Sequence, residues 1–173
     1  LAVLPVGSTE QHGPHAPLGT DALTAEAIAA GGVERVDREV AIAPTVPVGV
    51  AAEHRQFAGT LWVSPDSFRS YVRETAESLA HHGWDRVVMV NGHGGNVAPL
   101  REVCARLTRE AAAYAVPFTW FDAIDPEEVG FPGVTGHPAP SHRHPVSPVR
   151  PQTAHTTGVV RARRTRARRA VRC

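Results

Sequence analysis

The sequence predicts an α/β fold with a largely parallel sheet. Short runs of apolar and β-branched residues alternate with longer segments whose apolar residues recur at helical spacing. This alternation is typical of parallel sheets whose connections are helices. The strands are expected at residues 1–6, 40–46, 86–90 and 115–121.

The first part of the chain holds two of these strands and an alanine-rich helix. Residues 1–6 form a continuous apolar run that ends at a glycine, as a buried strand that leads into a loop does. Residues 22–30 are rich in alanine and should form a helix that stops at the following glycine pair. Residues 40–46 should form a second strand, which ends before Pro47.

The clearest helix signal begins at Ser64. Serine suits the N-cap, Pro65 the first helical position, and Asp66 the positive end of the helix dipole. Gly83 supplies a stop. The residues expected on one face of this helix are Phe68, Tyr71, Val72, Thr75 and Leu79.

A strand, a loop and a second amphipathic helix follow. Residues 86–90 are rich in valine and should form a central strand that runs into the polar loop 91–96. Residues 115–121 should form the last strand. The apolar face of the helix between them is expected to carry Leu100, Val103, Cys104, Leu107 and Ala111.

The composition changes after Gly136. Proline recurs between residues 138 and 151, arginine recurs between 161 and 172, and no apolar periodicity remains. We therefore expect one domain over residues 1–136 and a disordered tail over residues 137–173. A lost reading frame, or a degraded gene copy, would explain the same break.

Charge is distributed unevenly along the chain. All 18 basic residues are arginine, and all 17 acidic residues precede His137. An acidic body without lysine suits a salt-rich cytoplasm, although genomic base composition would produce the same bias. The arginine-rich end lacks aromatic residues and any recognisable module, so we do not expect a nucleic-acid partner.

Two further observations bear on the class of protein. No apolar run approaches the ~20 residues that span a bilayer, so no membrane partner is expected. The two cysteines make no disulfide framework, and the expected location is the cytoplasm.

Polar side chains with metal-binding chemistry follow two of the expected strands. Glu10 and His12 follow the first strand, with Asp21 close behind, and His93 follows the strand over 86–90. In open α/β sheets, ligands bind at the carboxyl ends of the strands. Imidazole and carboxylate groups together suit divalent Zn, Mn or Fe, and a shared carboxylate can bridge two ions about 3.5 Å apart.

Each candidate also has a simpler interpretation. A histidine beside glycine is most often a solvated turn residue, and His15 has an equally plausible structural role. Glu53 and His54 precede an apolar stretch, and either line a pocket or form a surface turn. Cys104 occupies an apolar helix position and is expected in the core.

Three motifs resemble those of a known family. Residues 4–21 read LPVGSTEQHGPHAPLGTD, which is similar to the opening metal-binding motif of the creatininase (creatinine amidohydrolase) family. Glu53-His54, with FAGTL at 57–61, resembles the middle motif of that family, and NGHGGN at 91–96 resembles its second metal-ligand motif. The resemblance covers residues 1–122.

The resemblance implies a three-layer α/β/α creatininase-like fold with a mostly parallel sheet. It also implies two divalent metal ions and hydrolysis of a C–N amide bond of a small cyclic or formyl amide by a metal-activated water, often in a homo-oligomer that is a hexamer. Carried over residue by residue, Glu10 and His93 bind one ion, His12 binds the other, and Asp21 bridges them. Glu53 and His54 are candidates for catalytic roles.

Two departures from the family pattern qualify this implication. Creatininase proper has a glutamate where this chain has Gly95, which favours a formamide-deformylase-like branch or a mycofactocin-precursor-type peptidase. The acidic body without lysine favours a haloarchaeal-type member of the family. His137 begins like the motif of the catalytic histidine, but no glutamate follows it. The alternative is therefore a catalytically impaired metal-binding remnant.

Overall fold

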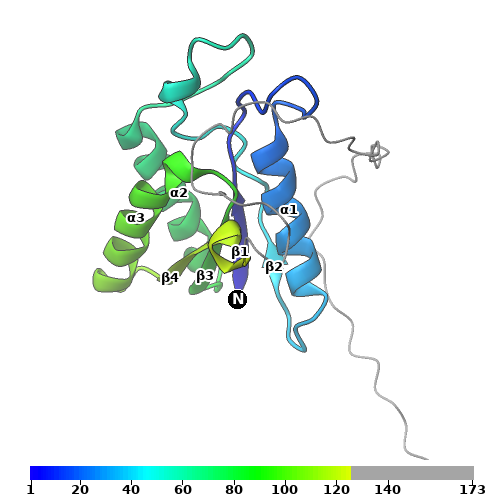
Figure 1. Ribbon diagram of the computed structural model, residues 1–173. Helices are drawn as coiled ribbons and strands as arrows, with labels where there is room; N and C mark the ends of the chain where they lie inside the picture. Colours follow the sequence, from blue (N-terminus) through cyan, green and yellow to red (C-terminus); the bar gives the residue numbers. More distant parts are fainter. Residues whose placement is uncertain (126–173) are drawn as a thin grey trace, which may run out of the picture.

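The computed structural model describes residues 1–125, in which a parallel four-stranded sheet lies between helices (Figure 1). The strand order is β2-β1-β3-β4, and every pair of neighbours is parallel. The strands are β1 (Ala2–Val6), β2 (Ala41–Ile42), β3 (Arg86–Asn91) and β4 (Tyr114–Thr119). The predicted α/β fold with a parallel sheet is confirmed.

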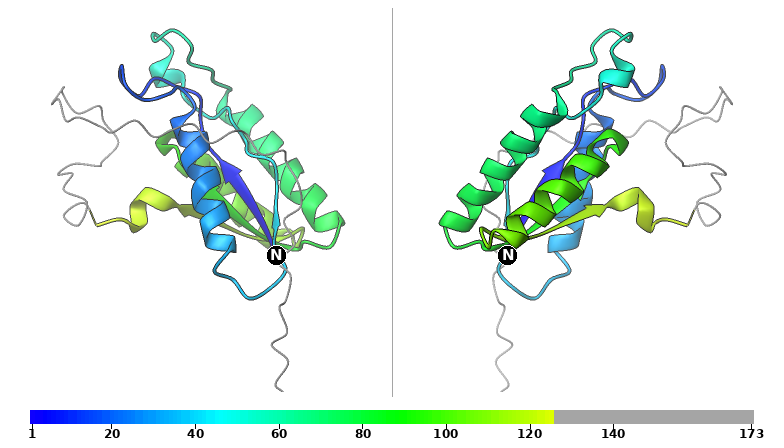
Figure 2. Two further views of the ribbon diagram at one scale, coloured as in Figure 1. Left: turned by 90° about the vertical axis from the view of Figure 1, so that its right-hand side faces the viewer. Right: turned by 90° about the vertical axis from the view of Figure 1, so that its left-hand side faces the viewer.

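The helices form a layer on each face of the sheet (Figure 2). The helices are α1 (Thr20–Val33), α2 (Pro65–His81) and α3 (Val97–Arg109). Helix α1 packs on one face, where Val3 and Val90 meet Ala25 and Ala29. Helices α2 and α3 pack on the other face. The larger core there includes Leu4, Met89, Phe68, Val72, Leu100 and Leu107. Alternate residues of β1 and β3 thus point into different cores, as the pleat requires.

Helix α2 begins and ends as its sequence predicts. Ser64 is the N-cap, and its hydroxyl accepts a hydrogen bond from the Ser67 N–H. Gly83 follows the helix with a φ of 93°, a conformation that glycine adopts without strain. The buried face differs in one respect. Tyr71 is 58% exposed, and the buried face continues instead from Val72 to Ala76, one turn further along.

Four element boundaries differ from the predictions. Helix α3 ends at Arg109, so Ala111, which the sequence predicts on its apolar face, lies beyond the helix and is exposed, with a φ of 54°. Helix α1 continues through the glycine pair to Val33, which is buried against the sheet, so tertiary packing outweighs the glycine signal. Strand β2 has two residues, and Val46 forms only an isolated bridge to Val6. Strand β4 ends at Thr119, and the 3-10 helix η3 (Trp120–Ala123) follows it.

The start of α1 packs closely against the ends of β1 and β3. A Cβ atom on Gly7 would lie 2.3 Å from the Ala22 Cα, and one on Gly92 would lie 2.2 Å from the Asp21 carbonyl oxygen. Both positions therefore require glycine. This contact places Asp21, in the first turn of α1, beside the loops that leave β1 and β3.

Two predictions concern features beyond this fold. The tail over residues 137–173, with His137, lies outside the described residues. Among residues 1–125, no helix is long and apolar enough to cross a membrane.

Candidate metal centre

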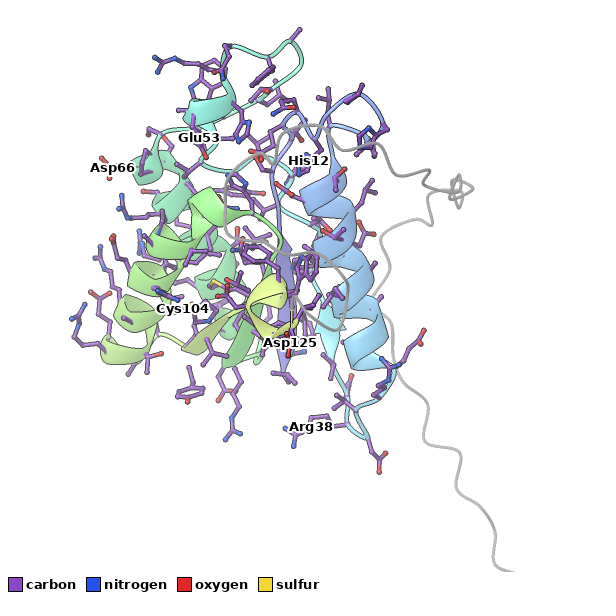
Figure 3. All side chains as sticks on the ribbon, viewed as in Figure 1. His12, Arg38, Glu53, Asp66, Cys104 and Asp125 are labelled. Carbon is purple, nitrogen blue, oxygen red and sulfur yellow. The ribbon has the colours of Figure 1, made fainter. Side chains whose placement is uncertain are left out.

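The four predicted ligands converge at the carboxyl ends of β1 and β3. Glu10 and His12 lie in the loop after β1, Asp21 lies in α1, and His93 follows β3. Glu10, Asp21 and His93 are buried, and His12 is partly buried. Figure 3 shows His12 and Glu53 at the same end of the molecule, the end where the loops after β1 and β2 lie.

Asp21 lies between the two histidines. Its Oδ1 is 2.9 Å from His12 Nε2, and its Oδ2 is 3.1 Å from His93 Nδ1. His93 Nδ1 is also 3.3 Å from Glu10 Oε1. Each oxygen of the Asp21 carboxylate therefore faces a different imidazole, which is the arrangement that a bridging carboxylate needs.

Backbone carbonyls determine which ring nitrogen of each histidine is a donor. His12 Nδ1 lies 3.1 Å from the Glu10 carbonyl oxygen, and His93 Nε2 lies 2.8 Å from the Val50 carbonyl oxygen. Because a carbonyl only accepts, these two nitrogens must carry hydrogen. His12 Nε2 and His93 Nδ1 are left facing the carboxylates, and these are the nitrogens that could bind an ion.

The carboxylates retain buried acceptor atoms. Glu10 Oε2 is buried without a hydrogen bond, and Asp21 Oδ2 is buried with only its ion-pair contact to His93 Nδ1 at 3.1 Å. A buried carboxylate oxygen without a partner is costly, and a cation would satisfy it. Glu10, His12 and Asp21 offer ligand atoms within 4.8 Å of one another. Two carboxylates and two imidazoles fit Zn²⁺, Mn²⁺ or Fe²⁺.

Without a metal ion, protons on the two histidines supply the positive charge of this cluster. Burial opposes a charged His93, but the close contacts of its Nδ1 with the Asp21 and Glu10 carboxylates outweigh this effect and raise the pKa of His93 to about 10. The Asp21 carboxylate likewise raises the pKa of His12. Burial acts to raise the pKa of Asp21, yet the interactions with His12 and His93 lower it overall. The site is thus built to hold positive charge.

The middle motif lies over this cluster. Glu53 and His54 belong to the 3-10 helix η1 (Ala52–His54). Glu53 Oε1 is 3.7 Å from His93 Nε2, and Glu10, Glu53 and His93 form a second group with ligand atoms within 4.8 Å. His54 Nε2 is 3.6 Å from Glu10 Oε1. The sequence left open whether Glu53 and His54 line a pocket or form a surface turn. Their contacts with Glu10 and His93 place them beside the candidate metal centre.

Other candidates lie elsewhere. His15 is exposed and belongs to neither group. Cys104 is buried in the core, where desolvation raises the pKa of its thiol to about 12.

Sequence reasoning missed one group that contacts a candidate ligand, the Val50 carbonyl, and one that binds the segments beside the site, the Asn96 side chain. The Val50 carbonyl carries no side-chain signal and is visible only in the fold. Asn96 ends the NGHGGN motif, and its place before a helix would be read as an ordinary N-cap.

Comparison with known proteins places these residues in a family. The family model described as creatininase, creatinine amidohydrolase, matches residues 1–160. The chain is 42% identical over 115 residues to the mycofactocin precursor peptide peptidase of Mycolicibacterium smegmatis, a match that covers 64% of this chain and 46% of that protein. It is 30% identical over 101 residues to the creatinine amidohydrolase of Pseudomonas putida, which covers 56% and 38% of the two chains.

Solved structures agree with this placement. A mutant creatininase of the Zn-Zn type aligns with a TM-score of 0.64 at 28% identity, over 75% of this chain and 54% of that chain. A structure described as creatininase Mn aligns with a TM-score of 0.64 at 26% identity, over the same shares. The chain spans less than half the length of the curated relatives it matches. With a family model that matches residues 1–160, the chain belongs to the creatininase family.

Proposed function

We propose that this chain forms the metal-binding part of an amidohydrolase that cleaves a C–N amide bond with two divalent ions. The observation that carries the proposal is the pair of contacts that Asp21 makes, one oxygen toward His12 and the other toward His93. Glu10, Asp21 and His93 would hold one ion, and His12 and Asp21 would hold the other. The similar creatininase structures of the Zn-Zn type and with Mn support zinc and manganese as the metals, and iron is the third candidate.

The ions and the protein divide the chemistry between them. Bound divalent ions lower the pKa of a water molecule and polarise an amide carbonyl. We propose that Glu53 accepts the proton of the attacking water, because its carboxylate lies near the buried ligands and is 53% exposed to solvent. His54 would hold Glu10 in place through its contact with Oε1. The catalytic role that the resemblance gives to His137 is a further proposal.

The surroundings of Glu10 support a substrate with an apolar group. Glu10 N–H donates to the Leu18 carbonyl, and Leu61 N–H donates to the Thr9 carbonyl, so two exposed leucines flank this part of the loop. Phe57 is exposed on the same segment as Leu61. A small formyl or cyclic amide is our first candidate for the substrate. The exposed side chains of Leu18, Phe57 and Leu61 favour an apolar peptide as the second candidate. The identity with the mycofactocin precursor peptide peptidase supports the same alternative.

Gly95 supports a substrate other than creatinine. A Cβ atom there would lie 2.1 Å from the Val50 carbonyl oxygen and 2.6 Å from His93 Nε2. The loop therefore has no room for the glutamate of creatininase proper, and this favours the formamide-deformylase-like branch. The acidic, lysine-free body supports a haloarchaeal-type member. We further propose, on the resemblance alone, a cytoplasmic hexamer.

A substrate panel tests the function. The full chain, loaded in turn with zinc, manganese and iron, would be assayed with creatinine, formamides, cyclic amides and short apolar peptides. We expect turnover of an amide other than creatinine and its loss with a chelator. Faster hydrolysis of creatinine than of every other compound would contradict the assignment. Metal binding without any turnover would favour the catalytically impaired remnant.

A further inference from the structure

Asn96 joins two segments that border the metal centre. Its side chain is fully buried. The amide Oδ1 accepts a hydrogen bond from the Val50 N–H at 2.9 Å, and Nδ2 donates to the Gly7 carbonyl at 2.9 Å. Gly7 directly follows β1, and Val50 lies just before η1. Both polar atoms of one side chain are therefore used to hold these two segments together.

The Asn96 side chain makes no hydrogen bond to the helix that follows it. Asn96 ends the 3-10 helix η2 (Gly94–Asn96), and its backbone is already helical, with a φ of −82° and a ψ of −15°. A capping side chain requires a non-helical backbone at its own position, so this asparagine does not cap α3. Its amide group is used for the contacts between the two segments instead.

Val50 links Asn96 to His93. The peptide between Gly49 and Val50 is bound at both ends, since its N–H donates to Asn96 and its carbonyl accepts from Val63 N–H at 3.1 Å. The next carbonyl, that of Val50, is then directed at His93 Nε2, 2.8 Å away.

Two glycines allow these contacts. A Cβ atom on Gly49 would lie 2.5 Å from Asn96 Oδ1, and one on Gly95 would lie 2.1 Å from the Val50 carbonyl oxygen. Any larger residue at either position would displace an atom of the connection from Asn96 to His93. Glycine is therefore required beside the Asn96 amide and again beside the Val50 carbonyl, the two groups through which Asn96 is connected to His93.

We propose that Asn96 is a positioning residue that acts on His93 through the Val50 peptide. By directing the Val50 carbonyl at Nε2, it makes Nε2 the donor and leaves Nδ1 toward Glu10 and Asp21. The inference rests on the proposed function, because Nδ1 is the nitrogen assigned to the metal. Loss of such an indirect contact typically weakens metal binding about 10–100-fold.

The test compares three variants with the wild-type chain. Asn96→Ala removes both hydrogen bonds, and Asn96→Asp keeps the acceptor for Val50 but loses the donor to Gly7. Thr108→Val is the matched control, because it removes a side-chain hydrogen bond to the Ala115 N–H at the far end of β4. Zinc affinity would be measured by competition with a chelating dye. Proton–nitrogen correlation spectra of histidine-labelled protein would report which nitrogen of His93 binds zinc, with His93→Gln used to assign the signal.

We expect zinc on Nδ1 of His93 in the wild type and in Asn96→Asp. Asn96→Ala should bind zinc about 10–100-fold more weakly and lose this signature, while Thr108→Val should stay within about threefold of the wild type. The inference is overturned if Asn96→Ala keeps both the affinity and the signature, or loses no more than Thr108→Val. Should Asn96→Ala fail to fold, loss of the signature in a folded Asn96→Asp would overturn it equally. A wild-type chain that binds no zinc, manganese or iron would instead contradict the proposed function.

Discussion

Asp21 Oδ2 lies 3.1 Å from His93 Nδ1, although the two residues come from different layers of the fold. Asp21 belongs to α1 on one face of the sheet, and His93 follows a strand within it. Their contact depends on the close packing of Gly92 under the Asp21 backbone. The site therefore exists only where helix and strand meet.

Replacing Asp21 by Ala should remove most of the bound metal. The carboxylate faces both histidines, so its loss should weaken both proposed ion sites at once. Asp66→Ala is the matched control, because that carboxylate is 98% exposed on α2. Elemental analysis of the two purified variants would check this, and equal metal content would refute the bridging role.

The metal-free protein should lose stability as the pH rises from about 6.5 to about 10. The folded-state pKa of His93 is raised from 6.5 to about 10, so its contribution is fully present below 6.5 and is lost as the pH passes through the folded value. The raised pKa of His12 acts in the same direction. The pKa of Asp21 is lowered in the folded protein. The stability that this carboxylate contributes is therefore present above its ordinary pKa of 3.8 and is lost in acid.

Urea unfolding in the presence of a chelator, repeated across this pH range, would measure the slope. The variant His93→Gln should show a flatter dependence, because it lacks the proton taken up on folding. A wild-type profile that is as flat as that of the variant would contradict the prediction.

Gly95→Ala and Gly94→Ala should differ sharply although the residues are neighbours. The new methyl group at residue 95 would overlap the Val50 carbonyl, whereas one at residue 94 would meet no atom within 4 Å. We expect a loss of about 1–3 kcal/mol in the free energy of unfolding for Gly95→Ala. For Gly94→Ala we expect a change within about 0.5 kcal/mol. Chemical denaturation measures both, and equal values would show that the loop relaxes freely.

Replacing Glu53 by Gln should lower kcat at least about a hundredfold on any substrate that the panel identifies, because an amide cannot accept the proton. Metal content should stay at the wild-type level, since the buried ligands are unchanged. The control is Glu34→Gln, an exposed carboxylate at the end of α1. Unaltered kcat would remove Glu53 from the mechanism, and a loss of metal would make it a ligand instead.

Phe68→Ala should unfold the protein far more readily than Tyr71→Ala. Both aromatic residues lie on α2, but Phe68 is 1% exposed and Tyr71 is 58% exposed. The cavity left at residue 68 should reduce the free energy of unfolding by about 3–5 kcal/mol. The change at residue 71 should be smaller by several-fold, and thermal melts would rank the two. The reverse order would mean that this face of α2 is covered in solution.

Local signals in the sequence were sufficient for much of the fold. The cap at Ser64, the stop at Gly83 and the valine run of β3 each depend on a residue and its near neighbours, so their structure was predictable. The element boundaries that failed depend on distant contacts. Helix α1 passes through its glycines because Val33 packs on the sheet, which no local pattern reports.

The candidate site divides in the same way. The sequence by itself determined the kinds of ligand and their places after two strands, because parallel strands bring their carboxyl ends to one edge of a sheet. Only the tertiary structure decided which nitrogen of each histidine is free, since that depends on the Glu10 and Val50 carbonyls. It also decided that Glu53 lies beside His93 and that Asn96 turns away from its own helix. Backbone carbonyls and contacts between distant segments have no signature in residue type, and they appear only once the chain is folded.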